Sequence, residues 1–418
     1  MNRRSKDFKW LALVLCVVLA ALALASCGGG SSDGGSAAGA EAASGEGGGG
    51  SADAAGGGEI KVGVLFSTSG ALTITEEPAK NAALMAIEEI NAAGGVNGKT
   101  LVPVYEDYGS DPALAVDKIK KLIMEDEVVA TVGLYTSASR IACRPVLEEN
   151  DGLLFYPTFY EGEDPSPNIV YTGACPNQQG DLFVPWLVEN VGPKFFLLGT
   201  DTVYMQLINS QAKELLAANG GEVVAEEYVP SGHSDFATII NKINETKPDV
   251  IYLNLNGDSA VAFYKAYKQY GLDSSVMPTA SFCSDENTFG ALGPEISAGH
   301  MISINYFNTI DTPENQKFVE DYAAAYGSDS VLQSVAEASY KSVYLLKYAL
   351  EEIGDGEVTP ESIRAALADV EIDAPGGAVK VDSDNYHLYL KARIGKVNAD
   401  GLLETVYESE ELIKPEPV

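Results

Sequence analysis

VVATVGLYTSASRIACRPVLEENDGLLFYPT, residues 128–158, contains the pattern that decides the fold. An apolar run at 128–132 is followed by residues 137–150, whose apolar and charged side chains alternate with helical spacing. A second apolar run, GLLFYPT, follows at 152–158. Both runs end in aromatic and hydroxyl side chains. The order strand, helix, strand predicts parallel strands connected by a helix.

The same alternation continues on both sides of this stretch. Further strands are predicted at 59–66, 99–107, 194–201, 222–230, 249–256 and 276–282. Further helices are predicted at 78–95, 111–126, 208–221, 235–247 and 259–271. Apolar strands that alternate with amphipathic helices indicate α/β architecture with parallel sheets covered on both faces. Because there are too many strands for one sheet, we expect two doubly wound parallel-sheet lobes.

The first 58 residues predict export and anchoring rather than a folded domain. Residues 1–26 combine basic residues with an apolar run of secretory length, which is the pattern of a signal peptide. Leu24-Ala25-Ser26-Cys27 resembles a bacterial lipobox, so Cys27 is the expected lipidation site and mature N-terminus; the alternative is an ordinary transmembrane anchor. Residues 27–58 are rich in Gly, Ala and Ser and are expected to form a flexible tether. We therefore expect an extracytoplasmic protein held at the cell membrane by its lipid.

Composition excludes several classes of function. The chain carries 27 basic and 60 acidic residues, a formal charge of −33, which opposes binding to nucleic acid or anionic lipid. The spacing of the five cysteines predicts neither a disulfide framework nor a zinc site. The three histidines, His233, His300 and His387, lie in no hydrolase or metalloprotease motif, so we expect no enzyme, no catalytic residue, no metal and no cofactor.

The predicted strands place several polar loops at one edge of each sheet. In open α/β sheets, ligands bind beyond the carboxyl ends of the strands. Two lobes that face each other across a cleft would bring together the loops at 134–139, 155–162, 199–206, 254–259 and 281–287. The helix that begins near Ser137 would also direct its free backbone N–H groups into that cleft.

The loops offer neutral polar groups and aromatic faces, with carboxylates from the second half of the chain. The first-lobe candidates are Tyr135, Ser137, Tyr156, Thr158 and Tyr160. The second-lobe candidates are Thr202, Tyr204, Asn256, Asp258 and Glu286. Such a site suits a small, uncharged polar ligand. We expect Glu286 to accept the ligand's N–H groups while Ser137 serves its carbonyl. The simpler alternatives are that Asp258 forms a turn or helix cap and that Tyr156 is a buried strand residue.

From residue 59 onward the chain resembles the periplasmic-binding-protein type I family, and more narrowly its urea-binding and short-chain-amide-binding members. The stretches that carry the resemblance include AIEEINAAGGVNGK (86–99), TSASR (136–140), LLFYP with YEG (153–162), NIVYTGACPNQQ (168–179), LNGDSAVAFYK (255–265) and IDAPGG (372–377). The resemblance implies two lobes joined by three crossovers: lobe I at 59–178 and 310–372, and lobe II at 179–309 and 373–418. It also implies ligand contacts at Tyr135, Ser137, Tyr156, Thr158, Tyr160, Tyr204 and Glu286.

The resemblance further implies a monomeric receptor for an ABC permease, which closes its lobes around urea or a short-chain amide. This chain departs from the urea-binding pattern. Tyr135 stands where those proteins tend to have tryptophan, and Thr202 replaces an aromatic residue. Losing a ring at 202 should enlarge the pocket and favour a larger amide. The alternatives are a branched-chain or neutral amino-acid-binding protein of the same fold, and an amide sensor that feeds a signalling partner.

Overall fold

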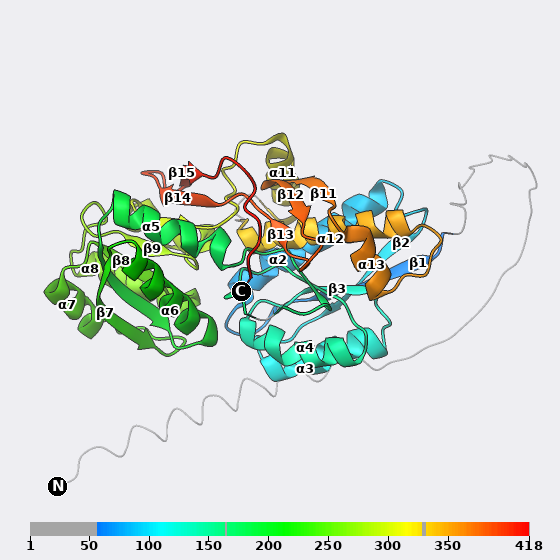
Figure 1. The fold of residues 1–418 in the computed structure, drawn as a ribbon, viewed down its shortest axis with the longest axis horizontal. Coiled ribbons are helices and arrows are strands. Elements are labelled where there is room, and N and C mark those ends of the chain that lie inside the picture. The colour runs from blue at the N-terminus through cyan, green and yellow to red at the C-terminus, as the bar shows by residue number, and fades with distance from the viewer. Residues whose placement is uncertain (1–56, 164, 328–331, 418) are drawn as a thin grey trace, which may run out of the picture. The chain divides into compact units, whose positions relative to one another are not determined.

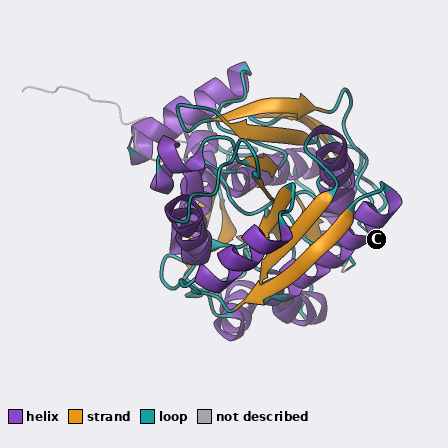
Figure 2. Ribbon diagram, turned by 90° about the vertical axis from the view of Figure 1, so that its left-hand side faces the viewer, coloured by secondary structure: helices purple, strands orange, loops and turns teal. Residues whose placement is uncertain are grey.

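The computed structural model describes residues 57–163, 165–327 and 332–417. The expected signal peptide, Cys27 and almost all of the tether lie outside these residues, so the lipid anchor stays a prediction. Within the described residues, no helix is long and apolar enough to cross a membrane. Two sheets, each covered by helices on both faces, organise the chain from Glu59 onward (Figures 1 and 2).

The first sheet has five parallel strands in the order β2-β1-β3-β4-β5. Their bounds are β1 Glu59–Leu65, β2 Thr100–Glu106, β3 Ala130–Gly133, β4 Leu154–Tyr156 and β5 Ile169–Tyr171. Val62 of β1 lies between Pro103 of β2 and Ala130 of β3. Pro103 has no N–H to donate, and β2 is an edge strand, where proline is tolerated.

Helices from two distant parts of the chain cover the first sheet. They are α2 Thr73–Ala92, α3 Pro112–Met124, α4 Ser137–Glu149, α11 Pro313–Tyr326, α12 Ser334–Ile353 and α13 Pro360–Leu367. Helix α2 packs against α12, and α3 packs against α4. At the predicted start of this helix, Asp111 caps α3 by accepting a hydrogen bond from Ala113 N at 2.8 Å, and Pro112 follows at the first helical position. Helix α2 begins five residues before the expected start and contains Pro78.

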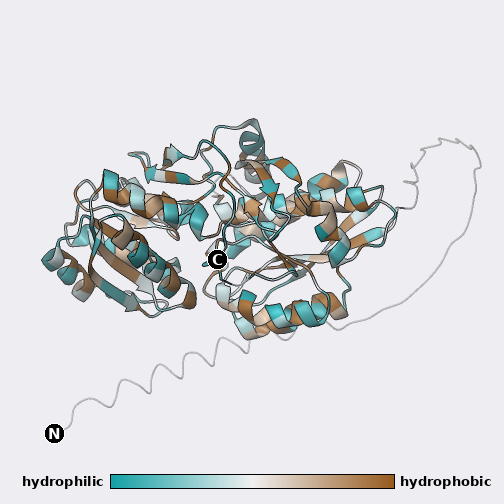
Figure 3. Ribbon diagram, viewed as in Figure 1, coloured by the Kyte–Doolittle hydropathy of each residue, from teal (hydrophilic) through white to brown (hydrophobic). Residues whose placement is uncertain are grey.

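The second sheet has seven strands in the order β15-β14-β10-β9-β8-β6-β7. The parallel strands are β6 Lys194–Thr200, β7 Glu222–Val229, β8 Val250–Asn254, β9 Thr279–Ser281 and β10 Met301–Ser303. Two antiparallel strands extend it at one edge: β14 Arg393–Val397 and β15 Leu403–Glu408. The helices of this lobe are α5 Gly180–Asn190, α6 Val203–Ala218, α7 Ala237–Thr246, α8 Gly257–Gln269, α9 Glu286–Leu292 and α10 Pro294–Ser297. Strands are mostly hydrophobic, whereas the helices mix hydrophobic and hydrophilic residues (Figure 3).

The chain passes between the two sheets three times. It leaves the first sheet after β5, passes the short 3-10 helix η1 at Pro176–Gln178, and enters the second lobe at α5. It returns between β10 and α11, and α11 contacts α2 of the first lobe. The doubly wound two-lobe architecture and its three crossovers are therefore as predicted.

The third crossover differs from the expected boundary at 372/373. A small antiparallel sheet is formed by β11 Glu371–Ala374, β12 Gly377–Val381 and β13 Leu388–Tyr389. Next to β13, His387 forms a bridge with Tyr171 of β5. The segment up to β13 therefore lies with the first lobe, and the chain enters the second sheet only at β14. The sequence did not indicate this boundary, because no helix separates these short strands and the pattern therefore does not show where the chain changes lobes.

Candidate functional site

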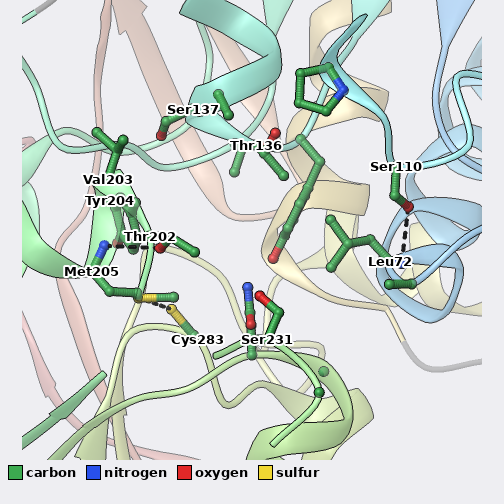
Figure 4. Close-up of a pocket in the computed structure, with 18 of the residues that line it drawn as sticks. Leu72, Ser110, Thr136, Ser137, Thr202, Val203, Tyr204, Met205, Ser231 and Cys283 are labelled. Atoms are coloured by element: carbon green, nitrogen blue, oxygen red, sulfur yellow. Dashed lines mark hydrogen bonds between the residues drawn. The ribbon is translucent and has the colours of Figure 1, made fainter. Parts of the chain in front are cut away.

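A cavity of about 450 Å³ lies where loops of both lobes converge. On the first-lobe side it is lined by residues that follow β1, β2, β3 and β4, and on the second-lobe side by residues that follow β6, β7, β8 and β9. All of these loops leave the carboxyl ends of parallel strands, as the sequence predicts. Figure 4 shows Thr136 and Ser137 at the start of α4, with Tyr204, Met205 and Cys283 among the second-lobe residues.

Seven of the ten predicted ligand-binding residues line this cavity. They are Tyr135, Ser137, Thr158, Thr202, Tyr204, Asn256 and Asp258. Tyr156, Tyr160 and Glu286 do not line it. The apolar part of the wall, which sequence reasoning did not assign, includes Leu72, Phe159, Val203, Met205 and Cys283.

The start of α4 supplies the main polar surface of the first lobe. Thr136 is the N-cap residue, and its hydroxyl accepts from Ser139 N at 3.1 Å. Ser137 and Ala138 are the first two helical residues, and their backbone N–H groups have no acceptor within the helix. Both residues line the cavity, so the positive end of the α4 dipole borders it.

Two second-lobe helices, α6 and α8, also begin at the cavity. Thr202 caps α6 by accepting from Met205 N at 3.5 Å, so its hydroxyl already serves the helix. Tyr204 packs against Phe159 with ring centroids 5.8 Å apart. Its buried hydroxyl has no hydrogen-bond partner among the described residues.

Asp258 is the only ionisable acid or base among the described residues that line the cavity, apart from tyrosine and cysteine. It lies in the first turn of α8 and is exposed. The N-cap position of α8 is occupied by Asn256, whose side chain makes no capping hydrogen bond. Asp258 is therefore not the cap of this helix, and its carboxylate is available to a cationic group in the cavity.

Tyr156 and Tyr160 lie behind the wall instead of in it. Tyr156 donates from its hydroxyl to the backbone oxygen of Tyr135 at 2.8 Å, so it supports a residue that lines the cavity. Tyr160 Oη lies 2.5 Å from His387 Nε2. Burial raises the pKa of Tyr156 to about 12. The alternative that Tyr156 is a buried strand residue describes it better, and Tyr160, which was expected to contact the ligand, is buried as well.

Glu286 is not placed where a ligand in this cavity would meet it. It is the first residue of α9, and its Oε1 accepts from Asn308 N at 3.0 Å. Burial, followed by the negative charge of Asp285, raises the pKa of Glu286 to about 8. The prediction that Glu286 takes the N–H groups of a ligand is therefore not supported by this geometry.

A buried ion pair that sequence reasoning did not assign lies directly behind Ser137. Arg140 Nη2 donates to Glu161 Oε1 at 2.9 Å, and Ser137 Oγ donates to Glu161 Oε2 at 2.5 Å. The expectation that Ser137 gives its proton to a ligand carbonyl therefore conflicts with its hydrogen bond to Glu161. The TSASR and YEG stretches contain all three residues, but no spacing rule indicates that they meet.

Within the described ranges, no group of three or more His, Cys, Asp or Glu side chains could hold a metal ion. The cysteines of this part of the chain, Cys143, Cys175 and Cys283, are free. The cavity thus offers hydroxyls, backbone N–H groups, one carboxylate and an apolar wall. These groups can bind and orient a small solute.

Residues 60–418 match the model of the periplasmic binding protein domain. This chain belongs to the periplasmic binding protein family. Its relatives include the Leu/Ile/Val-binding protein BraC3 of Rhizobium johnstonii, 24% identical over 82% of this chain and 94% of that protein. Another is the leucine-, isoleucine-, valine-, threonine- and alanine-binding protein of Pseudomonas aeruginosa, 25% identical over 77% of this chain and 86% of that protein.

Solved structures share the fold. A solute-binding protein of an ABC transporter from Rhodopseudomonas palustris, in complex with 3,4-dihydroxybenzoic acid, has a TM-score of 0.77 at 22% identity and covers 85% of this chain and 99% of its own. The branched-chain amino acid transporter substrate-binding protein LivJ from Streptococcus pneumoniae, in complex with isoleucine, has a TM-score of 0.74 at 22% identity and covers 85% of this chain and 100% of its own.

The family assignment gives the general function of the chain: it is an extracytoplasmic periplasmic binding protein, and its curated relatives are binding proteins rather than enzymes. The narrower prediction of a urea- or amide-binding protein finds no support in these relatives. The two curated relatives are named for amino-acid ligands, which is the class of the alternative stated above.

Proposed function

We propose that the cavity of this protein takes a small neutral amino acid and delivers it to an ABC permease. The observation that carries the proposal is the combination of Asp258 with helix N-termini in one cavity. An amino acid is a zwitterion, so it needs a partner for its ammonium group and a partner for its carboxylate. Asp258 suits the former, and the first-turn N–H groups of α4 suit the latter.

The apolar wall and the volume support the same class of ligand. Leu72, Val203 and Met205 provide aliphatic contact for a small side chain. The cavity of about 450 Å³ falls within the usual range of ligand pockets and is far larger than a urea molecule requires. No lysine or arginine of the described ranges lines it, so a ligand with net negative charge lacks an ionic partner there.

A short-chain amide is the second candidate. The observation in its favour is the hydrogen bond from Ser137 to Glu161, which leaves the Ser137 oxygen ready to accept an N–H group from an uncharged ligand. Tyr135 and Thr158, which the resemblance assigns to amide binding, also line the cavity.

Isothermal titration calorimetry with the purified protein tests the proposal. L-leucine, L-alanine, acetamide, urea and 4-hydroxybenzoate are titrated into wild type and into Asp258→Asn. We expect binding of an amino acid, weakened about fivefold or more by Asp258→Asn, because a charge-assisted hydrogen bond contributes ~1.5–3 kcal/mol.

Binding of acetamide or urea without any amino acid would replace the first candidate by the second. Binding of 4-hydroxybenzoate alone would contradict both candidates. Equal affinity of wild type and Asp258→Asn for an amino acid would remove Asp258 from the ammonium site.

A further inference from the structure

Ser137, Glu161 and Arg140 form a buried chain of hydrogen bonds that begins at the cavity wall. Ser137 is 7% exposed, Glu161 2% and Arg140 0%. Ser137 belongs to the cavity wall, whereas Glu161 and Arg140 lie outside it. Arg140 lies over the rings of Tyr156 and Tyr160, at 5.2 and 4.5 Å from their centroids.

The chemistry of these three side chains fixes the direction of each hydrogen bond. Arginine keeps its charge in proteins and has only donors. A buried charge of this kind is retained when an opposite charge is paired with it, so Glu161 faces Arg140 as a carboxylate. A carboxylate has only acceptors, so the single hydroxyl proton of Ser137 points to Glu161 Oε2. Ser137 has no second proton to give to a ligand.

We propose that Glu161 is a positioning residue that sets Ser137 as a hydrogen-bond acceptor toward the cavity, so that the ligand presents an N–H group to Ser137. The proposal rests on the proposed function, because it concerns the orientation of the ligand in the same cavity. An amino acid presents one N–H of its ammonium group to Ser137 Oγ while Asp258 takes another, its carboxylate remaining with the backbone N–H groups of α4; a primary amide presents its NH₂ group. A carboxylate or carbonyl oxygen directed at Ser137 Oγ would instead meet a lone pair.

The loop that carries Glu161 is held by two other segments of the chain. Gln211 of α6 in the second lobe donates from Nε2 to the backbone oxygen of Glu161 at 3.1 Å. Glu163, two residues later, donates its N–H to Pro417 O at 2.7 Å. The loop that carries Glu161 is thus tied to α6 and to the C-terminal segment, which restrains its side chain relative to Ser137.

Glu161→Gln is the test variant, because glutamine has the same shape and can donate as well as accept. Arg140 has only donors, so it will hold the oxygen of the introduced side-chain amide, and the nitrogen of that amide will face Ser137. The Ser137 proton is then released toward the cavity. We expect the preference for L-leucine over its 2-oxo acid, and for acetamide over acetate, to fall about tenfold in whichever pair binds.

Ser137→Ala separates the effect of the direction of the Ser137 hydroxyl from the effect of the Glu161 charge. Removing the negative charge of Glu161 favours any anion through space, with or without the hydroxyl. In the Ser137→Ala background, Glu161→Gln should therefore leave only this smaller general effect. An equal loss of preference in both backgrounds would overturn the proposal. Glu148→Gln, which affects a partly exposed pair with Arg144 and the hydrogen bond from Ser166 near the end of α4, is the matched control and should leave both preferences unchanged.

Neutron diffraction from deuterium-exchanged crystals of the wild type gives a second readout that requires no ligand and no variant. We expect the Ser137 deuteron between Oγ and Glu161 Oε2. A deuteron directed into the cavity would overturn the proposal, even if Glu161→Gln fails to fold. If neither ligand pair binds the wild type while the deuteron lies toward Glu161, the proposed ligand class fails and the polarity of Ser137 stands.

Discussion

Glu161 and Glu286 are both buried acids that follow parallel strands, Glu161 in a loop and Glu286 at the first position of α9, yet they differ in their partners and in their position relative to the cavity. Glu161 follows β4, has Arg140 as its ionic partner, and lies against a residue that lines the cavity. Glu286 follows β9, and its Oε2 is buried without a hydrogen-bond partner among the described residues. Burial raises its pKa to about 8, so it is largely protonated at neutral pH. A buried acid thus becomes part of a binding site through its partners, and burial alone is insufficient.

The largest expected effect on stability comes from removing Arg140, the ionic partner of Glu161. Arg140→Met should lower the free energy of unfolding by about 3–5 kcal/mol, because it leaves the Glu161 charge buried without its partner. Thermal or guanidinium unfolding measures this change; urea is avoided because it is a candidate ligand. Arg144→Met on the same helix is the control, since the side chains of the Arg144–Glu148 pair are 36% and 43% exposed and the pair should contribute less than about 1 kcal/mol. Similar losses of unfolding free energy in the two variants would show that the buried pair stabilises the protein no more than the Arg144–Glu148 pair does.

The buried Glu286, which has no ionic partner among the described residues, should make the stability of the protein depend on pH. The folded-state pKa of Glu286 lies at about 8, above its ordinary value of 4.5, so the folded state binds more protons than the unfolded state between these values. Stability contributed by the protonated form is therefore present at low pH and decreases as pH rises from about 5 to about 8. The pKa values of Asp285, about 6, and Glu76, about 7, act in the same direction.

Glu286→Gln should make this decrease shallower, by an amount on the order of 2 kcal/mol between pH 5 and pH 8. Guanidinium unfolding of wild type and variant at several pH values measures the difference in slope. Asp258→Asn, which changes an exposed carboxylate of the same lobe, is a suitable control. Parallel pH profiles for wild type and Glu286→Gln would mean that Glu286 is ionised in the folded state, as the sequence-based hypothesis required.

Ligand affinity gives a second way to compare the region around Ser137 and Glu161 with Glu286. Ser137→Ala should weaken binding about 5- to 30-fold, because one hydrogen bond in the cavity is lost, which corresponds to ~1–2 kcal/mol. Glu286→Gln should change affinity by less than about twofold, since Glu286 does not line the cavity. Calorimetry with the ligand identified for the wild type gives both values. The reverse order would restore Glu286 as the second-lobe partner of the ligand.

The sequence predicted the fold well because apolar strands, helix caps and their alternation are local features. Asp111 and Pro112, for example, mark the start of α3 regardless of the rest of the chain. The strand ends also predicted five of the loops that line the cavity, but not those that follow β1, β2 and β7. Contacts between side chains are harder, because they depend on how two loops approach. Glu161 lies 24 residues from Ser137 in sequence, and nothing local distinguishes it from a surface acid.

The error at Glu286 has a similar cause. Its loop was correctly placed at the carboxyl end of a strand, and Cys283 of this loop does line the cavity. Helix α9 begins at Glu286, however, and its side chain turns to the backbone of Asn308. A shift of three residues along one loop thus separates a lining residue from a buried one. The resemblance to amide-binding proteins identified the family correctly, but the curated relatives favour another ligand class.

Tyr156→Phe should have the smallest effect and tests whether a residue behind the wall contributes only by support. The change removes the hydroxyl that donates to the backbone oxygen of Tyr135, while the ring that Arg140 covers is retained. We expect a loss of about 0.5–1.5 kcal/mol in the free energy of unfolding, measured by guanidinium unfolding, because one buried hydrogen bond is lost. Affinity should change by about twofold at most, since Tyr135 keeps its other contacts, including the bond from its N–H to Tyr108 Oη at 3.2 Å.

Tyr204→Phe is the matched comparison: its buried hydroxyl has no partner among the described residues, so its removal should reduce affinity without a comparable loss of stability. If Tyr156→Phe weakens binding as strongly as Ser137→Ala does, Tyr156 contacts the ligand directly when the lobes close. In that case the sequence-based assignment of Tyr156 was correct for the bound state.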